Sequence, residues 1–247
     1  MTTGNPTLSE NTFHEVRPTI IGESEAMTVQ GAVNKTAMLL LFTVVAAGFT
    51  WNLASTSGPA AAQGWMIGGG IAGFIIALVT TFKKTWSPVT APLYAIVEGL
   101  FLGAISFFFE KQFPGLVVQA VMFTFGTLAA LLFAYTTGII RASAGLRRGI
   151  VAATLGIALV YLVSLVLGFF GIQIPGIFGN GLIGIGFSVV VVIVAAMNLV
   201  LDFDLIENGA QSGAPKYMEW YAGFALLVTL IWLYLEILRL LSKLRSR

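Results

Sequence analysis

The sequence predicts an all-α, polytopic membrane protein, a bundle of seven transmembrane helices. Two observations lead to this prediction. Hydrophobic residues make up 57% of the 247 residues and charged residues only 10%, whereas soluble domains carry about 25% charged residues. The apolar stretches are continuous over about 20 residues, the length of a membrane-crossing helix, instead of alternating over about 10 residues as in barrel strands.

Seven apolar runs follow a polar N-terminal segment. Residues 1–33 lack the basic start and short apolar core of a signal peptide, so we expect a disordered cytoplasmic tail. Residues 34–247 then form the transmembrane domain. Each run can cross about 30 Å of hydrocarbon at about 1.5 Å per residue, and short loops rich in Gly and Pro separate the runs. The runs cover residues 36–53, 64–82, 90–109, 115–138, 149–170, 181–206 and 217–241.

The distribution of positive charge predicts a cell-membrane protein with a cytoplasmic N-terminus. With that orientation the outer loops hold only Lys111. The C-terminal tail would also lie outside if the seventh run crosses fully, which we favour over a re-entrant segment because the run has no Gly or Pro after Gly223. The inner side receives Arg17, Lys35, Lys83, Lys84, Arg141, Arg147, Arg148 and Lys216.

Several function classes are excluded by composition. Cysteine is absent and the single histidine, His14, precedes every apolar run. No thiolate nucleophile or histidine metal site therefore lies in the membrane, and a serine-based hydrolase would lack an obvious base. The basic residues are scattered, which argues against nucleic-acid binding. We expect no enzymatic activity and no cofactor.

Paired glycines indicate close helix packing. Gly69 with Gly73 and Gly99 with Gly103 have the small-xxx-small spacing of membrane helix contacts. We expect these contacts inside one bundle, with dimerisation as the alternative.

Acidic residues inside the apolar runs are the strongest functional signal. An ionised carboxylate at the bilayer centre costs at least about 2.5–3.5 kcal/mol. Glu98 lies deep in the third run, and Tyr94, four residues earlier on the same face, is a candidate local partner. Burial disfavours the charged form, so we expect Glu98 to be mostly neutral.

The sixth run carries a small and polar stripe. Ser188, Ala195, Asn198 and Asp202 are spaced to share one helix face. Asp204 is rotated by about 200° from Asp202 and should point elsewhere, toward a solvated helix end that also includes Glu207 and Asn208. Asp202 is therefore expected to lie against the seventh helix.

The seventh run presents a facing surface. Ala222, Leu226, Thr229, Leu233 and Glu236 recur at helical spacing. Glu236 has a possible local partner in Arg239, three residues later, so its role is open between an ion pair and a functional acid.

The pairing of "LDFDLIENG" with "LIWLYLEILRLLSKL" in the last run resembles the Bax inhibitor-1 family, also called transmembrane Bax inhibitor motif proteins. The seven runs and "EGLFLG" in the third run agree with that resemblance. The segment "KYMEWYAGF" is similar to a bacterial, actinobacterial branch.

The resemblance implies a pH-sensing acid pair. In better-understood members, one aspartate on the sixth helix and one on the seventh share a proton and control a calcium leak. Asp202 matches the first aspartate. One alignment register selects Glu236 for the second, and another, which we favour for its depth, places Thr229 there. Glu98 or Glu236 would then supply the second acid.

Two functions from different classes follow. The first is a pH-sensitive leak pathway for calcium or another cation, gated by buried carboxylates, with Asp202, Glu98, Glu236, Asn198, Thr229 and Asp204 as pH-sensing or pathway residues. Calcium prefers oxygen ligands, so it is a candidate permeant or bound ion, with Asp202 and Glu98 as candidate ligands. The second is a non-transporting helper that binds another membrane protein, such as a quality-control protease. Lipid is a partner in both.

Overall fold

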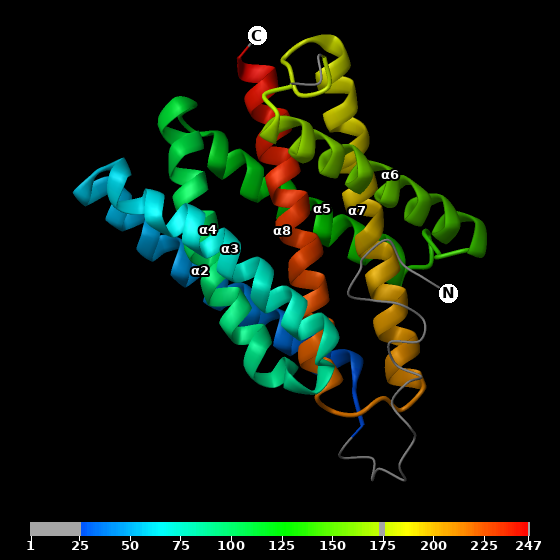
Figure 1. The fold of residues 1–247 in the computed structure, drawn as a ribbon. Coiled ribbons are helices and arrows are strands. Elements are labelled where there is room, and N and C mark those ends of the chain that lie inside the picture. The colour runs from blue at the N-terminus through cyan, green and yellow to red at the C-terminus, as the bar shows by residue number, and fades with distance from the viewer. Residues whose placement is uncertain (1–25, 173–175, 247) are drawn as a thin grey trace. The chain divides into compact units, whose positions relative to one another are not determined.

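The computed structural model describes residues 26–172 and 176–246, and this part of the chain is helical (Figure 1). Apart from an isolated bridge between Ala26 and Pro215, it contains no β pairing. The helices are α2 (Val29–Ser57), α3 (Pro59–Phe82), the short 3₁₀ helix η2 (Lys84–Trp86), α4 (Ser87–Gln112), α5 (Leu116–Thr136), α6 (Ala144–Phe169), α7 (Leu182–Gln211) and α8 (Met218–Arg245).

Seven of these helices are long and apolar enough to cross a membrane, which confirms the predicted fold class. They coincide with the seven apolar runs, with two notable differences. Helix α2 begins at Val29, seven residues earlier than expected, and α7 continues beyond residue 206, through Glu207, to Gln211. Helix α8 has 28 uninterrupted residues, about 42 Å at 1.5 Å per residue, as a full crossing requires. Most of the predicted N-terminal tail lies outside the described residues.

The described chain divides into two compact units. The α2–α4 unit contains residues 26–114 and 205–228, and the α5–α6 unit contains residues 115–204 and 229–246. Helices α7 and α8 each contribute one part to each unit. Both units are built from helices because, in lipid, backbone groups must be satisfied within each segment.

Small residues allow close packing in the α2–α4 unit. A Cβ added at Gly99 or Gly103 would collide with the backbone of α2 at Thr43 or Ala47. A Cβ added at Gly69 of α3 would lie 3.2 Å from Phe101 and 3.3 Å from Val97 of α4, a tight contact rather than a collision. These contacts confirm the predicted packing of the glycine pairs within one bundle.

Threonines on α2 are buried in the α2–α4 unit. Thr36, Thr43 and Thr50 are buried and donate hydrogen bonds to carbonyl groups one turn earlier on α2, which satisfies their hydroxyl groups without water. The Thr43 hydroxyl also lies 3.2 Å from the carbonyl oxygen of Ala95 on α4. The α2–α4 contact is therefore both close and polar.

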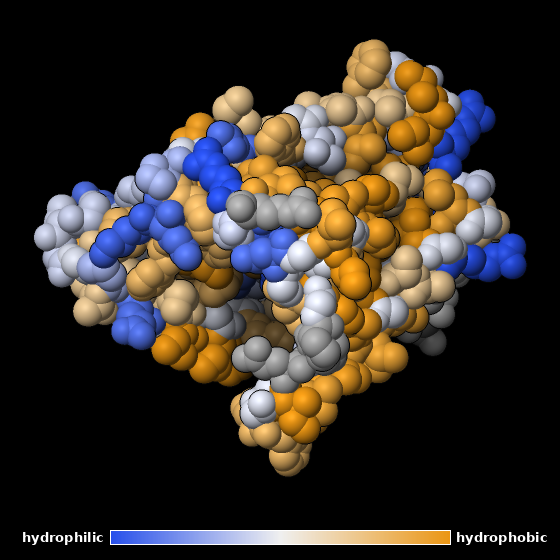
Figure 2. All heavy atoms as spheres, turned by 90° about the horizontal axis from the view of Figure 1, so that it is seen from above, coloured by the Kyte–Doolittle hydropathy of each residue, from blue (hydrophilic) through white to orange (hydrophobic). Residues whose placement is uncertain are grey.

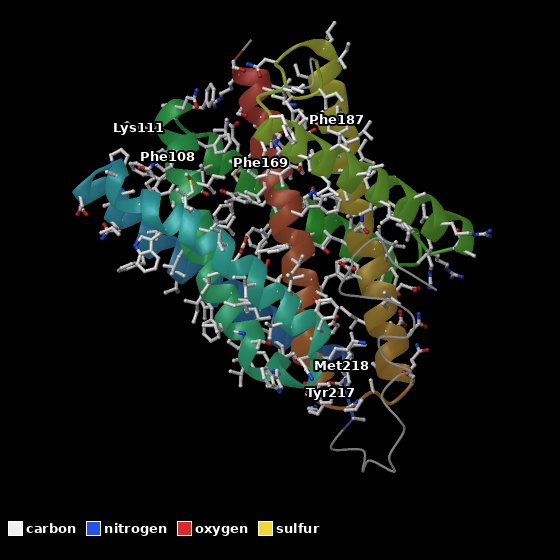
Figure 3. All side chains as sticks on the ribbon, viewed as in Figure 1. Phe108, Lys111, Phe169, Phe187, Tyr217 and Met218 are labelled. Atoms are coloured by element: carbon white, nitrogen blue, oxygen red, sulfur yellow. The ribbon has the colours of Figure 1, made fainter. Side chains whose placement is uncertain are left out.

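The start of α2 is joined to the α7–α8 connection. Thr28 caps α2, and its backbone N–H and hydroxyl lie 3.1 and 3.0 Å from the Glu219 carboxylate at the start of α8. Lys216 forms an ion pair with the same carboxylate at 2.9 Å. Tyr217 and Met218 mark this end of α8 in Figure 3. Glu219 is thus a buried link between two helix starts.

In the α5–α6 unit, α6, α7 and α8 share an apolar cluster. Ile157 of α6 packs with Val191 and Val194 of α7, and Tyr161, Phe187 and Trp232 pack against them. The rings of Tyr161 and Phe187 are 6.2 Å apart, edge to face. This cluster holds three helices together around the polar residues described below.

Much of the molecular surface is apolar. Large apolar side chains are exposed on several helices, including Phe49, Phe74, Phe123 and Leu165, and Figure 2 shows broad apolar areas on the face in view. Lipid chains can cover such a surface without the penalty that water would impose, in agreement with contact with the bilayer.

Candidate functional site

The polar stripe predicted on α7 is buried. Ser188, Asn198 and Asp202 expose 1%, 1% and 0% of their surface, and Ala195 is fully buried. Their spacing places them on one face of a continuous helix. Because buried polar groups need hydrogen-bond partners, the groups opposite this face define what the stripe can do.

Asp202 faces α8, as the helix geometry predicted, and meets Thr229 there. The hydroxyl of Thr229 on α8 donates a hydrogen bond of 2.6 Å to the Asp202 carboxylate. Both side chains are buried. Glu236 does not meet Asp202 in this way, since it lies seven residues further along α8, about 10 Å away along the helix axis.

Asn198 links α7 to α6 one helical turn before Asp202. Its amide nitrogen donates to the Thr154 hydroxyl at 2.9 Å and to the Val194 carbonyl at 2.8 Å. The carbonyl of Val194 can only accept a hydrogen bond, which fixes the amide orientation. The Asn198 Oδ1 atom therefore points away from the Val194 carbonyl. Among the described residues it is the one buried side-chain nitrogen or oxygen without a hydrogen-bond partner.

Glu236 forms the predicted local ion pair. Arg239 Nη1 lies 3.0 and 3.1 Å from the two Glu236 carboxylate oxygens. Tyr161 on α6 donates a hydrogen bond of 2.8 Å to Glu236 and accepts one of 2.6 Å from Arg239. Glu236 is 2% exposed. The negative charge of Glu236 is therefore balanced by Arg239, one helical turn later on α8.

Lys243 was not identified as a site residue from the sequence, where it belonged to the basic C-terminal tail. The structure buries it, with 4% exposed, and its ammonium group contacts Ser188 on α7 at 2.9 Å. A usable signal existed, because Lys243 follows Glu236 by seven residues and so extends the same α8 face.

These contacts follow one antiparallel register. Ser188 and Asp202 are 14 residues apart on α7, and their partners Thr229 and Lys243 are 14 residues apart on α8. We call this arrangement the polar ladder. It extends over about 21 Å of helix and consists of Asp202–Thr229, Asn198–Thr154, Glu236–Tyr161–Arg239 and Ser188–Lys243.

Asp204 differs from the expectation of a solvated helix end. It forms an ion pair with Arg147 of α6, with 14% and 19% of the Arg147 and Asp204 side chains exposed. The predicted rotation away from Asp202 is correct, but the helix continues and α6 covers this face. Glu207 is exposed, as expected.

Glu98 belongs to the α2–α4 unit and is buried on α4. Its carboxylate lies against Gly73 of α3, where a side chain would collide with it. Tyr94, the expected local partner, packs edge to face on Phe224 of α8 at a ring separation of 5.0 Å. The missing side chain of Gly73 therefore makes room for the acid.

The described residues contain no group of three or more His, Cys, Asp or Glu side chains placed to hold a metal ion. Asp202 accepts a hydrogen bond from the neutral Thr229 hydroxyl, and Asn198, one helical turn earlier on the same helix face, is bonded to Thr154.

Comparison with known proteins agrees with the arrangement of helices. A search of curated proteins found no match. A model of the family described as Bax inhibitor 1 like matches residues 5–246. The match includes all seven membrane-length helices and the polar ladder, and the chain therefore belongs to the Bax inhibitor 1 like family, as a multi-pass membrane protein.

Proposed function

We propose that this protein is a pH-sensitive leak pathway for calcium or another cation, gated by the buried Asp202. The observation that carries the proposal is the position of Asp202, which is fully buried on α7 and bonded to Thr229 of α8 at 2.6 Å. We place the protein in the cell membrane with a cytoplasmic N-terminus, and in a bacterial, actinobacterial branch of the family.

The gating step follows from the cost of burying charge. An ionised carboxylate in a helix contact without water loses its hydration, and protonation removes the cost of that loss. With Asp202 protonated, α7 and α8 remain packed and the pathway is closed. Loss of the proton leaves a charge that Thr229 continues to stabilise by its hydrogen bond and that draws water or a cation to the carboxylate, so the pathway opens.

The same face offers oxygen ligands to a cation. The Asp202 carboxylate, the unpaired Asn198 Oδ1 and the Thr229 hydroxyl come from adjacent positions, and oxygen ligands are those that calcium prefers. Because Oδ1 is buried without a partner, water or a cation entering here would satisfy it. Asn198 thus serves as a neutral ligand beside the titrating acid.

The remaining acids have separate roles in this proposal. Glu236 balances Arg239, and Asp204 holds α6 to α7 through Arg147. Glu98 is a further buried acid, in the α2–α4 unit, and in this proposal it holds a proton. The protein has no enzymatic activity in this proposal.

Parallel flux assays on two variants test the function. Purified Asp202→Asn and Asp204→Asn proteins in liposomes would be compared with the wild type for calcium flux at several pH values. Asp202→Asn keeps the size of the side chain but removes the titrating group, so flux should lose its pH dependence.

The Asp204→Asn variant is the matched control, because it lies two residues away and faces α6. It should retain the pH dependence. Equal effects at both positions would contradict the assignment of Asp202 as the gate. An absence of flux in the wild type at every pH would favour the helper function instead.

A further inference from the structure

The Lys243 ammonium group lies in a complete oxygen cage. Its Nζ atom is 3.0 Å from the carbonyl oxygen of Gly184, 3.2 Å from that of Ile177 and 2.9 Å from the Ser188 hydroxyl. An ammonium group has three N–H donors, and each therefore has one acceptor. The charge is removed from water, since Lys243 is only 4% exposed.

The chemistry of the cage indicates which ions it accepts. Its three ligands are neutral oxygens, two of them backbone carbonyls, which stabilise a positive charge without neutralising it. A divalent ion would remain poorly compensated there because no carboxylate is among the ligands. The separations of about 3 Å suit an ammonium ion.

The position of the cage connects it to the polar ladder. Ser188 is the first member of the α7 stripe, and Lys243 is the last member of the facing α8 surface. The other ligands come from the α6–α7 connection and the first turn of α7. The cage therefore closes the end of the ladder that is furthest from Asp202.

We propose that the oxygens of Ile177, Gly184 and Ser188 form a binding site for a small monovalent cation, and that Lys243 occupies this site as a tethered cation. By filling the cage, Lys243 excludes free cations from this end of the ladder. The binding site is independent of the proposed leak function, whereas the exclusion of permeating cations rests on it.

The first experiment measures binding in the absence of flux. In Lys243→Ala the cage is empty of its tethered ion, and the unfolding temperature should fall. Ammonium chloride should restore roughly half or more of that loss in a saturable manner, because a ligand that binds the folded state stabilises it. Tetramethylammonium chloride at equal ionic strength is too large for the cage and should not.

Two controls identify the site. Wild-type protein should show no specific ammonium effect because Lys243 fills the cage. In Lys243→Ala combined with Ser188→Ala, the ammonium effect should weaken at least severalfold, since one ligand is lost. An equal response to ammonium and tetramethylammonium, or none to either, would overturn the binding site.

The second experiment measures cation flux in liposomes. Lys243→Ala should raise the leak severalfold at a pH where the wild type is closed, and Asp202→Asn in the same background should still remove the pH dependence. If Lys243→Ala binds ammonium specifically but its leak is unchanged, the binding site stands and the proposal that Lys243 excludes permeating cations is refuted. A wild type without any leak would instead refute the proposed function.

A measurement on the wild-type protein covers the case in which Lys243→Ala does not fold. Reductive methylation in detergent should modify the exposed Lys83 and Lys111 rapidly and Lys243 at least tenfold more slowly, until the protein unfolds. Methylation of all three at the same rate would show that the ammonium group is not held in the cage.

Discussion

The hydrogen bond between Thr229 and Asp202 gives a quantitative test of the protonation state of the gate. The perturbation is a double-mutant cycle that combines Thr229→Val, which keeps the shape of the side chain but removes the hydroxyl, with Asp202→Ala. The interaction energy of the pair is obtained from the four proteins, so the cavity left by each substitution largely cancels.

The expected magnitude depends on whether Asp202 is charged. Hydrogen bonds between neutral groups in membrane helices average about 0.6 kcal/mol, whereas a bond to a charged group contributes about 1.5–3 kcal/mol. Both side chains are buried and the bond is short, at 2.6 Å, so solvent screening reduces neither value much. The two states of Asp202 are therefore separable by about 1 kcal/mol or more.

The assay is reversible unfolding in mixed micelles with increasing denaturing detergent, at pH 5 and at pH 8. A titrating gate predicts an interaction energy near 0.6 kcal/mol at pH 5, which rises to at least about 1.5 kcal/mol at pH 8. The interaction energy should be larger at pH 8 because an ionised carboxylate is a stronger hydrogen-bond acceptor than a protonated one.

One result would refute this reasoning directly. If the interaction energy were the same at both pH values, Asp202 would not change its protonation state in this range. Thr229→Ser, which restores a hydroxyl group, is the control and should recover most of the interaction.

Three other predictions can be tested separately. Gly103→Ala should destabilise the protein by about 1–3 kcal/mol in thermal unfolding, because the new Cβ would collide with the Ala47 carbonyl. The control is Gly126→Ala, whose Cβ would meet nothing within 4 Å and which should be tolerated. Equal stability of the two variants would contradict the close α2–α4 contact. Glu98→Gln should fold normally beside Gly73 while changing the pH response of flux, and an unchanged response would leave Glu98 a structural role. Cysteines replacing the exposed Lys83 and Arg148 should react only with reagents on the cytoplasmic side, and labelling from outside in intact cells would reverse the orientation.

The sequence alone determined the fold class and the main polar contact. Long continuous apolar runs allow few structures in lipid other than helices, so the number of spans was readable from composition and length. Helical spacing also separated the face of Asp202 from that of Asp204, and the resemblance to the family singled out Thr229 on the facing helix. These predictions succeeded because they depend on the fixed geometry of a single helix.

Only the tertiary structure decided which groups from distant parts of the chain meet. Arg147 and Asp204 are 57 residues apart, and no periodicity within α6 or α7 specifies their contact. The burial of Lys243 depends on carbonyl groups of the α6–α7 connection and of the first turn of α7, which are present at every residue and leave no trace in the sequence. Side-chain spacing therefore predicts the face on which a residue lies, while the partner it meets is decided by how the helices and their connections pack.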